Sequence, residues 1–361
     1  MLDRLSPTRR AALKTLGLLT TAALVPQLPT ARGENAESRT QLGLVIYDCG
    51  IRRRWLQQTD PSVDLFEPLA FLRHCHALGA GGMQAALGTL SADRIRELRD
   101  FAGQHNLYIE AIVRPPREES DVDRFAAEIR TAAEVGALAA RTVVMPGRRY
   151  EQFDSMAAYR AAEVEAERML RLAAPVVERH RLPLAVENHK DQRIEDRVAL
   201  LRRLGCEYIG ACVDTGNSFA LLDDPYDAVE QLAPFAFSVH LKDQAVREYD
   251  GGFLLGDIPL GQGCFDLPRM MAALRKAKPT IRFSLELITR DPLKVTCLTE
   301  KYWTTMQGVS GADLARTLRI VRSHAADNLQ QVSSLSLDQQ VALEEANITA
   351  SLRYARQHLA L

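Results

Sequence analysis

From residue 40 onward, short apolar runs alternate with longer amphipathic stretches, and this repeat constrains the fold more than any other feature of the sequence. Short apolar runs predict buried strands, and apolar residues that recur every three or four positions predict helices. Strands that alternate with helices form a parallel sheet, and eight such units close into a (β/α)8 TIM barrel of the α/β class. The eight expected strands span residues 43–47, 82–86, 108–113, 142–145, 184–187, 209–213, 236–241 and 282–287.

Helical patterns lie between these strands and continue beyond the last one. The 361 residues are enough for one barrel of this kind, which takes about 250 residues, with additions. We therefore expect a barrel over residues 40–290 and a C-terminal helical extension over 291–361 that packs on the barrel exterior or covers one mouth. The expected helices span residues 63–77, 91–105, 119–136, 155–181, 193–204, 224–233, 266–277, 310–325 and 337–359.

The first 33 residues have the pattern of an export signal. Arg9 and Arg10 precede an apolar run from Leu16 to Val25, and small residues follow near Ala31. The run is too short to cross a bilayer, which takes about 20 apolar residues, so no stable membrane span is expected. Residues 1–33 resemble a twin-arginine signal, which sends folded proteins across the bacterial inner membrane, and predict a periplasmic location. A basic N-terminus with a chance arginine pair is the alternative.

The charge of the remaining chain argues against some partners. The sequence has 45 basic and 46 acidic residues, and residues 1–33 hold five basic and one acidic residue, which leaves 40 basic and 45 acidic residues. This net charge of −5 argues against nucleic acid as a partner. The six cysteines include no C-x-x-C pair, so no catalytic thiol is expected.

Four of the expected strands end in ionisable residues, and active sites of such barrels lie at the carboxyl ends of the strands. The four residues are Glu187, Asp214, His240 and Glu286. Each alone has an ordinary explanation, such as a cap, a turn or a core histidine. Three carboxylates in one barrel mouth repel one another unless a cation or shared protons hold them. Three oxygen donors and one imidazole suit one divalent ion, for which Mn²⁺ is expected and Mg²⁺, Co²⁺ or Zn²⁺ is possible.

The segments that carry these residues resemble a known family when they are taken together. They read V-E-N-H at 186–189, V-D-T-G-N at 213–217, H-L-K-D at 240–243 and L-E-L at 285–287. In this order they resemble the xylose-isomerase-like TIM-barrel superfamily, the sugar phosphate isomerase/epimerase group that includes ketose 3-epimerases, inosose dehydratases and endonuclease IV. The resemblance covers residues 40–290 and implies that Glu187, Asp214, His240 and Glu286 are the metal ligands. It also implies that the turn Gly261-Gln262-Gly263 precedes the last barrel helix.

The resemblance implies a metal-dependent isomerase or epimerase with a carbohydrate substrate. The ion would bind the sugar carbonyl and an adjacent hydroxyl, and would stabilise the enediolate formed when the neighbouring proton leaves. Glu187 and Glu286 would remove this proton and return it on the opposite face. Because phosphorylated intermediates are mainly cytosolic, export favours a non-phosphorylated or 3-keto sugar.

Four further residues are expected to contact the substrate. His189 and Lys242 follow Glu187 and His240 by two positions and so share their strand face if the strands continue. Asn217 stands where many epimerases of this group have a histidine, and its amide can bind a hydroxyl but cannot donate a proton as an acid. Arg247 is expected to bind a substrate oxygen, although an exposed loop position is its simpler explanation.

Alternatives to this function remain open. A lyase or dehydratase acting on keto-sugars or keto-glycosides would use the same site and the same enolate. A sugar-binding barrel without catalytic activity is the second alternative. DNA repair, as in endonuclease IV, is disfavoured because the chain has only 8 histidines and an acidic balance after residue 33. A homo-oligomer is possible, but no sequence feature identifies its interface.

Overall fold

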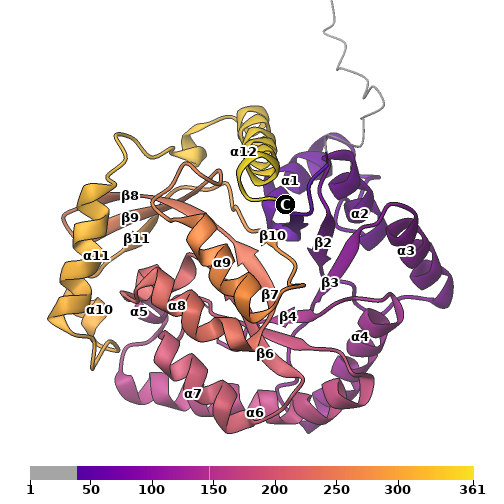
Figure 1. Cartoon of the computed structure of the whole chain (residues 1–361), viewed down its shortest axis with the longest axis horizontal. Coiled ribbons are helices and arrows are strands. Elements are labelled where there is room, and N and C mark those ends of the chain that lie inside the picture. Colours follow the sequence, from indigo (N-terminus) through magenta and orange to yellow (C-terminus); the bar gives the residue numbers. More distant parts are fainter. Residues whose placement is uncertain (1–38, 146) are drawn as a thin grey trace, which may run out of the picture. The chain divides into compact units, whose positions relative to one another are not determined.

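The computed structural model describes residues 39–145 and 147–361, so the expected signal at 1–33 lies outside the described residues. Eight parallel strands form a closed barrel in the order β1-β10-β7-β6-β5-β4-β3-β2 (Figure 1). This confirms the predicted (β/α)8 TIM barrel. The strands are β1 (Gly43–Val45), β2 (Gly82–Ala85), β3 (Tyr108–Ile112), β4 (Ala140–Thr142), β5 (Leu184–Glu187), β6 (Ile209–Asp214), β7 (Ala236–Leu241) and β10 (Ser284–Leu285).

The helices surround the barrel and bury their apolar faces against it. Ser91 and Asp266 cap α3 and α9, since their side chains accept hydrogen bonds from the backbone N–H groups of Arg94 and Arg269. The α-helices are α1 (Gly50–Thr59), α2 (Pro68–Ala77), α3 (Ala92–Gln104), α4 (Val122–Glu134), α5 (Arg149–Gln152), α6 (Met156–His180), α7 (Ile194–Leu204), α8 (Pro225–Leu232), α9 (Leu267–Ala277), α10 (Glu300–Trp303), α11 (Gly311–Ser323) and α12 (Leu337–His358).

A small antiparallel sheet, which the sequence analysis did not predict, lies beside the barrel. It has the strand order β11-β9-β8, with β8 (Asp243–Tyr249), β9 (Gly252–Ile258) and β11 (Leu293–Val295). The hairpin loop between β8 and β9 is Asp250-Gly251. An Asp-Gly pair between two alternating runs is a strong hairpin signal. The C-terminal extension therefore begins with a short strand, β11, ahead of the two helices expected at 310–325 and 337–359.

The extra C-terminal helices pack against the barrel in two places. Helix α12 lies along α1 (Figure 1), where the two oxygens of the buried Glu344 accept hydrogen bonds from the backbone N–H groups of Ile51 and Arg52, both at 2.8 Å. The chain that follows α11 joins β8, since the N–H of Ala326 donates to the carbonyl of Val246 at 2.8 Å. Residues 39–361 form one compact unit, and the expected domain boundary near residue 290 stays a prediction.

Two further expectations concern helices and cysteines. Within the described ranges, none of the helices combines the length and the apolar character that a bilayer span requires. All six cysteines lie in these ranges and are unpaired, and five of them are buried. Buried thiols in apolar surroundings behave as small core residues.

Candidate metal centre

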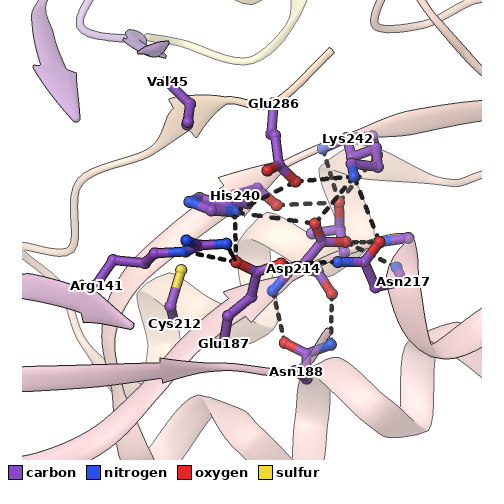
Figure 2. Close-up of polar contacts among 12 residues, drawn as sticks. Val45, Arg141, Glu187, Asn188, Cys212, Asp214, Asn217, His240, Lys242 and Glu286 are labelled. Carbon is purple, nitrogen blue, oxygen red and sulfur yellow. Dashed lines mark hydrogen bonds and ion pairs between the residues drawn. The ribbon is translucent and has the colours of Figure 1, made fainter. Parts of the chain in front are cut away.

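The carboxyl ends of four neighbouring strands bring the four expected metal ligands together. Glu187 ends β5, Asp214 ends β6, His240 lies in β7, and Glu286 directly follows β10. One ligand atom from each residue lies within 4.8 Å of the others, and all four side chains are buried (Figure 2). Asp214 and Ser284 are both register partners of His240, which places the ends of β6, β7 and β10 side by side.

Two buried atoms of the cluster have no hydrogen-bond partner among the described residues. They are Nδ1 of His240 and Oδ2 of Asp214. The Oδ2 atom lies 3.2 Å from Nζ of Lys242 and 4.0 Å from Nδ1 of His240, as ion-pair contacts. The Nδ1 atom lies 3.4 Å from Oε2 of Glu286 and 3.7 Å from Oε2 of Glu187. Buried polar atoms are nearly always satisfied in folded proteins. An imidazole lone pair and a carboxylate oxygen that face the same space therefore suit a divalent cation.

A buried chain of polar residues from β2 and β3 orients His240. The amide nitrogen Nε2 of Gln84 donates to Oε2 of Glu110 at 2.8 Å, which leaves Oε1 of Gln84 to accept from Nε2 of His240 at 2.7 Å. Ser238 also donates to Oε2 of Glu110, at 2.6 Å. In a neutral ring the proton is thus held on Nε2 and the lone pair of Nδ1 faces the cluster, although the neighbouring acidic groups outweigh burial and raise the pKa of His240. Such outer partners fix the tautomer of metal-binding histidines.

Arg141, on β4, binds Glu187 and was missed by the sequence analysis. Its Nε donates to Oε2 of Glu187 at 2.6 Å, a second guanidinium nitrogen donates to the same oxygen, and Asn217 donates to Oε1 at 3.0 Å (Figure 2). Burial alone would raise the pKa of Glu187, but Arg141 outweighs it and the pKa is lowered. The strand was expected two residues later, at 142–145, which placed Arg141 outside it. A lone arginine in the apolar run Leu138–Met145 was the available signal.

Asp214 is held by its neighbours so that one oxygen stays in the cluster. Its Oδ1 accepts from the backbone N–H groups of Gly216 at 2.8 Å and Asn217 at 2.7 Å. Asn188 binds its backbone, accepting from the N–H at 2.7 Å and donating to the carbonyl at 2.9 Å. Burial raises the pKa of Asp214 to about 6, although the Lys242 ammonium acts in the opposite direction. This carboxyl therefore lacks part of the positive charge that would keep it fully ionised.

Two lysines lie beside the cluster. The Nζ of Lys242, expected to contact substrate, lies 2.8 Å from Oε2 of Glu286 and 3.2 Å from Oδ2 of Asp214. Burial opposes the ionisation of Glu286, but Lys242 and His240 outweigh it and hold its pKa well below the usual range. Lys190 follows β5 and donates from Nζ to Oδ1 of Asn217. The sequence analysis missed Lys190, and a lysine three residues after Glu187 carried no distinctive signal.

The other two expected substrate contacts, His189 and Arg247, lie in different surroundings. Nδ1 of His189 lies 3.0 Å from the carbonyl of Gly147, and burial lowers the pKa of His189 even though Glu187 acts in the opposite direction. His189 is thus a neutral imidazole close to the cluster, with Nδ1–H bound to that carbonyl. Arg247 is exposed on β8 and donates to the carbonyl of Asp327 at 2.5 Å. The hairpin directs Arg247 to the C-terminal segment rather than to the cluster.

The expected Gly-x-Gly turn precedes α9 and is bound by Asp243. Oδ2 of Asp243 accepts from the backbone N–H groups of Gly261 and Gly263, both at 2.9 Å. A Cβ atom at Gly263 would lie 2.0 Å from Oδ1 of Asp243, so only glycine lets the backbone approach this closely. The turn therefore ties the start of the β8 hairpin to the last barrel helix.

Comparison with curated proteins gives one relative of interest. The chain is 27% identical over 152 residues to 3-oxo-isoapionate decarboxylase from Pectobacterium atrosepticum, a match that covers 41% of this chain and 55% of that enzyme. The chain therefore matches only about half the length of this relative.

Solved structures share the fold at low sequence identity. The probable 3-DHS dehydratase from Bacillus anthracis aligns with a TM-score of 0.52 and 14% identity over 74% of this chain and 97% of its own. L-ribulose 3-epimerase aligns with a TM-score of 0.51 and 15% identity over 88% and 96%. The 3-keto-D-glucoside 4-epimerase from E. coli aligns with a TM-score of 0.50 and 13% identity over 78% and 100%.

The family of the chain follows from a match to a family model, because the similarities to individual proteins are too low or too partial to assign it. The model described as xylose isomerase-like TIM barrel matches residues 72–310, which is more than half of the chain. The matched range runs from α2 through all later barrel strands and contains Glu187, Asp214, His240 and Glu286. The chain belongs to the xylose isomerase-like TIM-barrel family.

Proposed function

We propose that this protein is a metal-dependent isomerase or epimerase that removes a proton next to the carbonyl of a non-phosphorylated or 3-keto sugar. The observation that carries the proposal is the buried set of three carboxylates and one imidazole, with Nδ1 of His240 and Oδ2 of Asp214 unsatisfied. A divalent ion bound there, Mn²⁺ in our proposal and otherwise Mg²⁺, Co²⁺ or Zn²⁺, supplies the positive charge that stabilises an enediolate. Glu187, Asp214, His240 and Glu286 hold this ion.

Glu187 and Glu286 are the proposed acid and base because of their places around the barrel. They follow β5 and β10, with β6 and β7 between these strands, so they stand at the two ends of the ligand arc. A carboxylate on each side of the reacting carbon permits removal of a proton and its return to the opposite face. Arg141 and Asn217 orient Glu187, while Lys242 keeps Glu286 ionised. His189 and Asn217 are the proposed partners of substrate hydroxyls.

A lyase reaction on the same site is the second candidate, and the similarity to a decarboxylase favours it. Loss of carbon dioxide from a β-keto acid breaks a C–C bond and leaves its electron pair in the same enolate that proton removal forms. A carboxyl group can then return a proton to the carbon. The residues that stabilise the enolate therefore serve both reactions, and the bond that breaks depends on the substrate.

Isotope incorporation separates these candidates. A panel of free, phosphorylated and 3-keto sugars and keto-acids is incubated with the Mn²⁺-loaded protein in D₂O and followed by mass spectrometry, with a chelated control. We expect a metal-dependent gain of one deuterium, and a loss of rate of about 10²–10⁴-fold in Glu286→Gln. The exposed Glu207→Gln is the matched control and should keep the full rate. Loss of carbon dioxide or water would favour the lyase, and sugar binding without turnover would favour a binding protein.

We also propose that residues 1–33 direct export to the periplasm. The twin-arginine pattern supports this proposal. Replacing Arg9 and Arg10 together by lysine keeps the charge but removes the arginine pair, so the protein should remain in the cytoplasm of the host. Cell fractionation measures its location, with Arg32→Lys as the control. Equal periplasmic amounts of both variants would contradict the proposal.

A further inference from the structure

Lys190 is a buried cation that has no carboxylate partner among the described residues. Its residue is 2% exposed, and its Nζ donates to the amide oxygen Oδ1 of Asn217. Among the residues that the structure describes, no Asp or Glu oxygen lies within the 4.0 Å ion-pair distance of this Nζ. An amide oxygen can accept a hydrogen bond but cannot neutralise a charge. Lysines are almost never fully buried unless they are paired, so Lys190 calls for an explanation.

A second ammonium group makes the position of Lys190 still less favourable. The Nζ of Lys242 lies 3.4 Å from the same Oδ1 of Asn217, so two cations converge on one neutral amide. The charge of Lys242 is already balanced by Glu286 and Asp214. Burial, followed by repulsion from Lys242, lowers the pKa of Lys190 to about 8, which still leaves it mostly protonated at pH 7. Among the described residues, the Lys190 ammonium therefore has no carboxylate in direct ion-pair contact.

Asp257, an acid of the small sheet whose charge acts on Lys190, already has partners of its own. Asp257, on β9, is paired with Arg290 at 3.2 Å and accepts a hydrogen bond from Gln244 at 2.9 Å. Across the site, Glu187, Asp214, Glu286 and Asp257 are matched by four cations, Arg141, Lys190, Lys242 and Arg290. A divalent ion would make the site strongly positive. A neutral sugar would not offset this charge, whereas an anionic one would.

We propose that the substrate is a sugar acid whose carboxylate binds between Lys190 and Lys242, beside the metal centre. The site is next to the reacting groups, because Asn217 contacts both lysines and also donates to Glu187. Two ammonium groups that share one neutral acceptor offer a carboxylate two charge-assisted hydrogen bonds. This inference rests on the proposed function only for the substrate class; the anion site itself stands on the two lysines.

Calorimetric titration tests the anion site without turnover. The probes are D-gluconate and D-glucitol, which differ in a carboxylate against a hydroxymethyl group, and D-glucose 6-phosphate. They are titrated into Mn²⁺-loaded and metal-free protein, so that chelation by gluconate is separated from binding to the lysines. We expect gluconate to bind at least about tenfold more tightly than glucitol in both forms. Lys190→Met, which keeps the volume but removes the charge, should abolish most of this preference, and the exposed Lys294→Met should keep it.

Thermal unfolding gives a readout that a purely structural lysine would not produce. If Lys190 is retained for a ligand, Lys190→Met removes a buried charge that lacks a direct ion pair, and it should raise Tm while it weakens gluconate binding. The proposal is overturned if wild-type protein prefers neither anion to glucitol, if the gluconate preference survives Lys190→Met, or if the phosphate ester is the anion whose binding depends on Lys190. A gluconate preference together with a failed deuterium assay would keep the anion site and refute the proposed reaction.

Discussion

Two buried cations flank the ligand cluster, and they differ in how their charge is balanced. Arg141 donates two hydrogen bonds to Glu187, so its charge is balanced within the chain. Within the described residues, Lys190 contacts an amide oxygen that it shares with Lys242, and no carboxylate. Both positions carry the cost of removing a cation from water, but Arg141 is paired directly with an opposite charge and Lys190 is not. Arg141 thus neutralises a buried carboxylate of the chain itself, whereas Lys190, in our proposal, is available to bind the carboxylate of a ligand.

The largest expected effect, on the free energy of unfolding, follows from removing Arg141, the cation that is paired with Glu187. Arg141→Met leaves Glu187 as a buried carboxylate without its cation, and loss of one partner of such a pair costs about 3–5 kcal/mol. The free energy of unfolding, measured with urea, should fall by this amount in metal-free protein and by less in Mn²⁺-loaded protein, because a bound cation would take over the charge of Glu187. Arg203→Met, which breaks an exposed pair with Glu167, is the control and should cost less than about 1 kcal/mol. A loss of less than about 1 kcal/mol in Arg141→Met as well would show that the ion pair between Arg141 and Glu187 is not required for stability.

Removal of Lys190 is expected to have a smaller effect of the opposite sign, because Lys190→Met should stabilise the protein rather than destabilise it. Because the pKa of Lys190 is lowered to about 8 from 10.5, the unfolded chain binds more protons than the folded chain between these values. Stability should therefore rise with pH in this window as the folded protein loses the buried charge. Between pH 7.5 and 9.5 the stability advantage of Lys190→Met over wild type should shrink by about 2 kcal/mol. Urea unfolding at both pH values measures this difference, and a constant gap would mean that Lys190 is not the titrating group.

The smallest of these effects, on the affinity for Mn²⁺, concerns Gln84, which is not one of the proposed metal ligands but binds His240. Gln84→Leu removes the acceptor of the His240 Nε2–H and frees the ring to adopt the other tautomer. Loss of an outer partner of this kind lowers metal affinity about tenfold or more. Competition with a fluorescent chelator measures the Kd for Mn²⁺, and Gln104→Leu at the end of α3 is the matched control. Unchanged affinity in Gln84→Leu would mean that packing alone orients His240.

The residues of the site differ in how far they could be predicted from the sequence. Glu187, Asp214, His240 and Glu286 were predictable because each ends an apolar run, and barrel geometry brings the ends of parallel strands together. Arg141 was missed because a two-residue error in β4 moved it off the strand, and side-chain direction alternates at every residue. The partners of Gln84 lie on β3 and β7, so its role depends on registers across the barrel that no local pattern encodes.

The contact between α12 and α1 has a consequence for the order in which the molecule forms. Glu344 binds the backbone N–H groups of Ile51 and Arg52, which are 293 and 292 residues away in sequence. Those N–H groups lie at the start of α1, directly after Asp48, which accepts the N–H of Leu287 at 2.7 Å beside Glu286. A growing chain cannot make the contact until residues 337–358 have been synthesised and have left the ribosome. The loop beside the Glu286 end of the cluster therefore gains this support late, from a segment about 290 residues further along the chain.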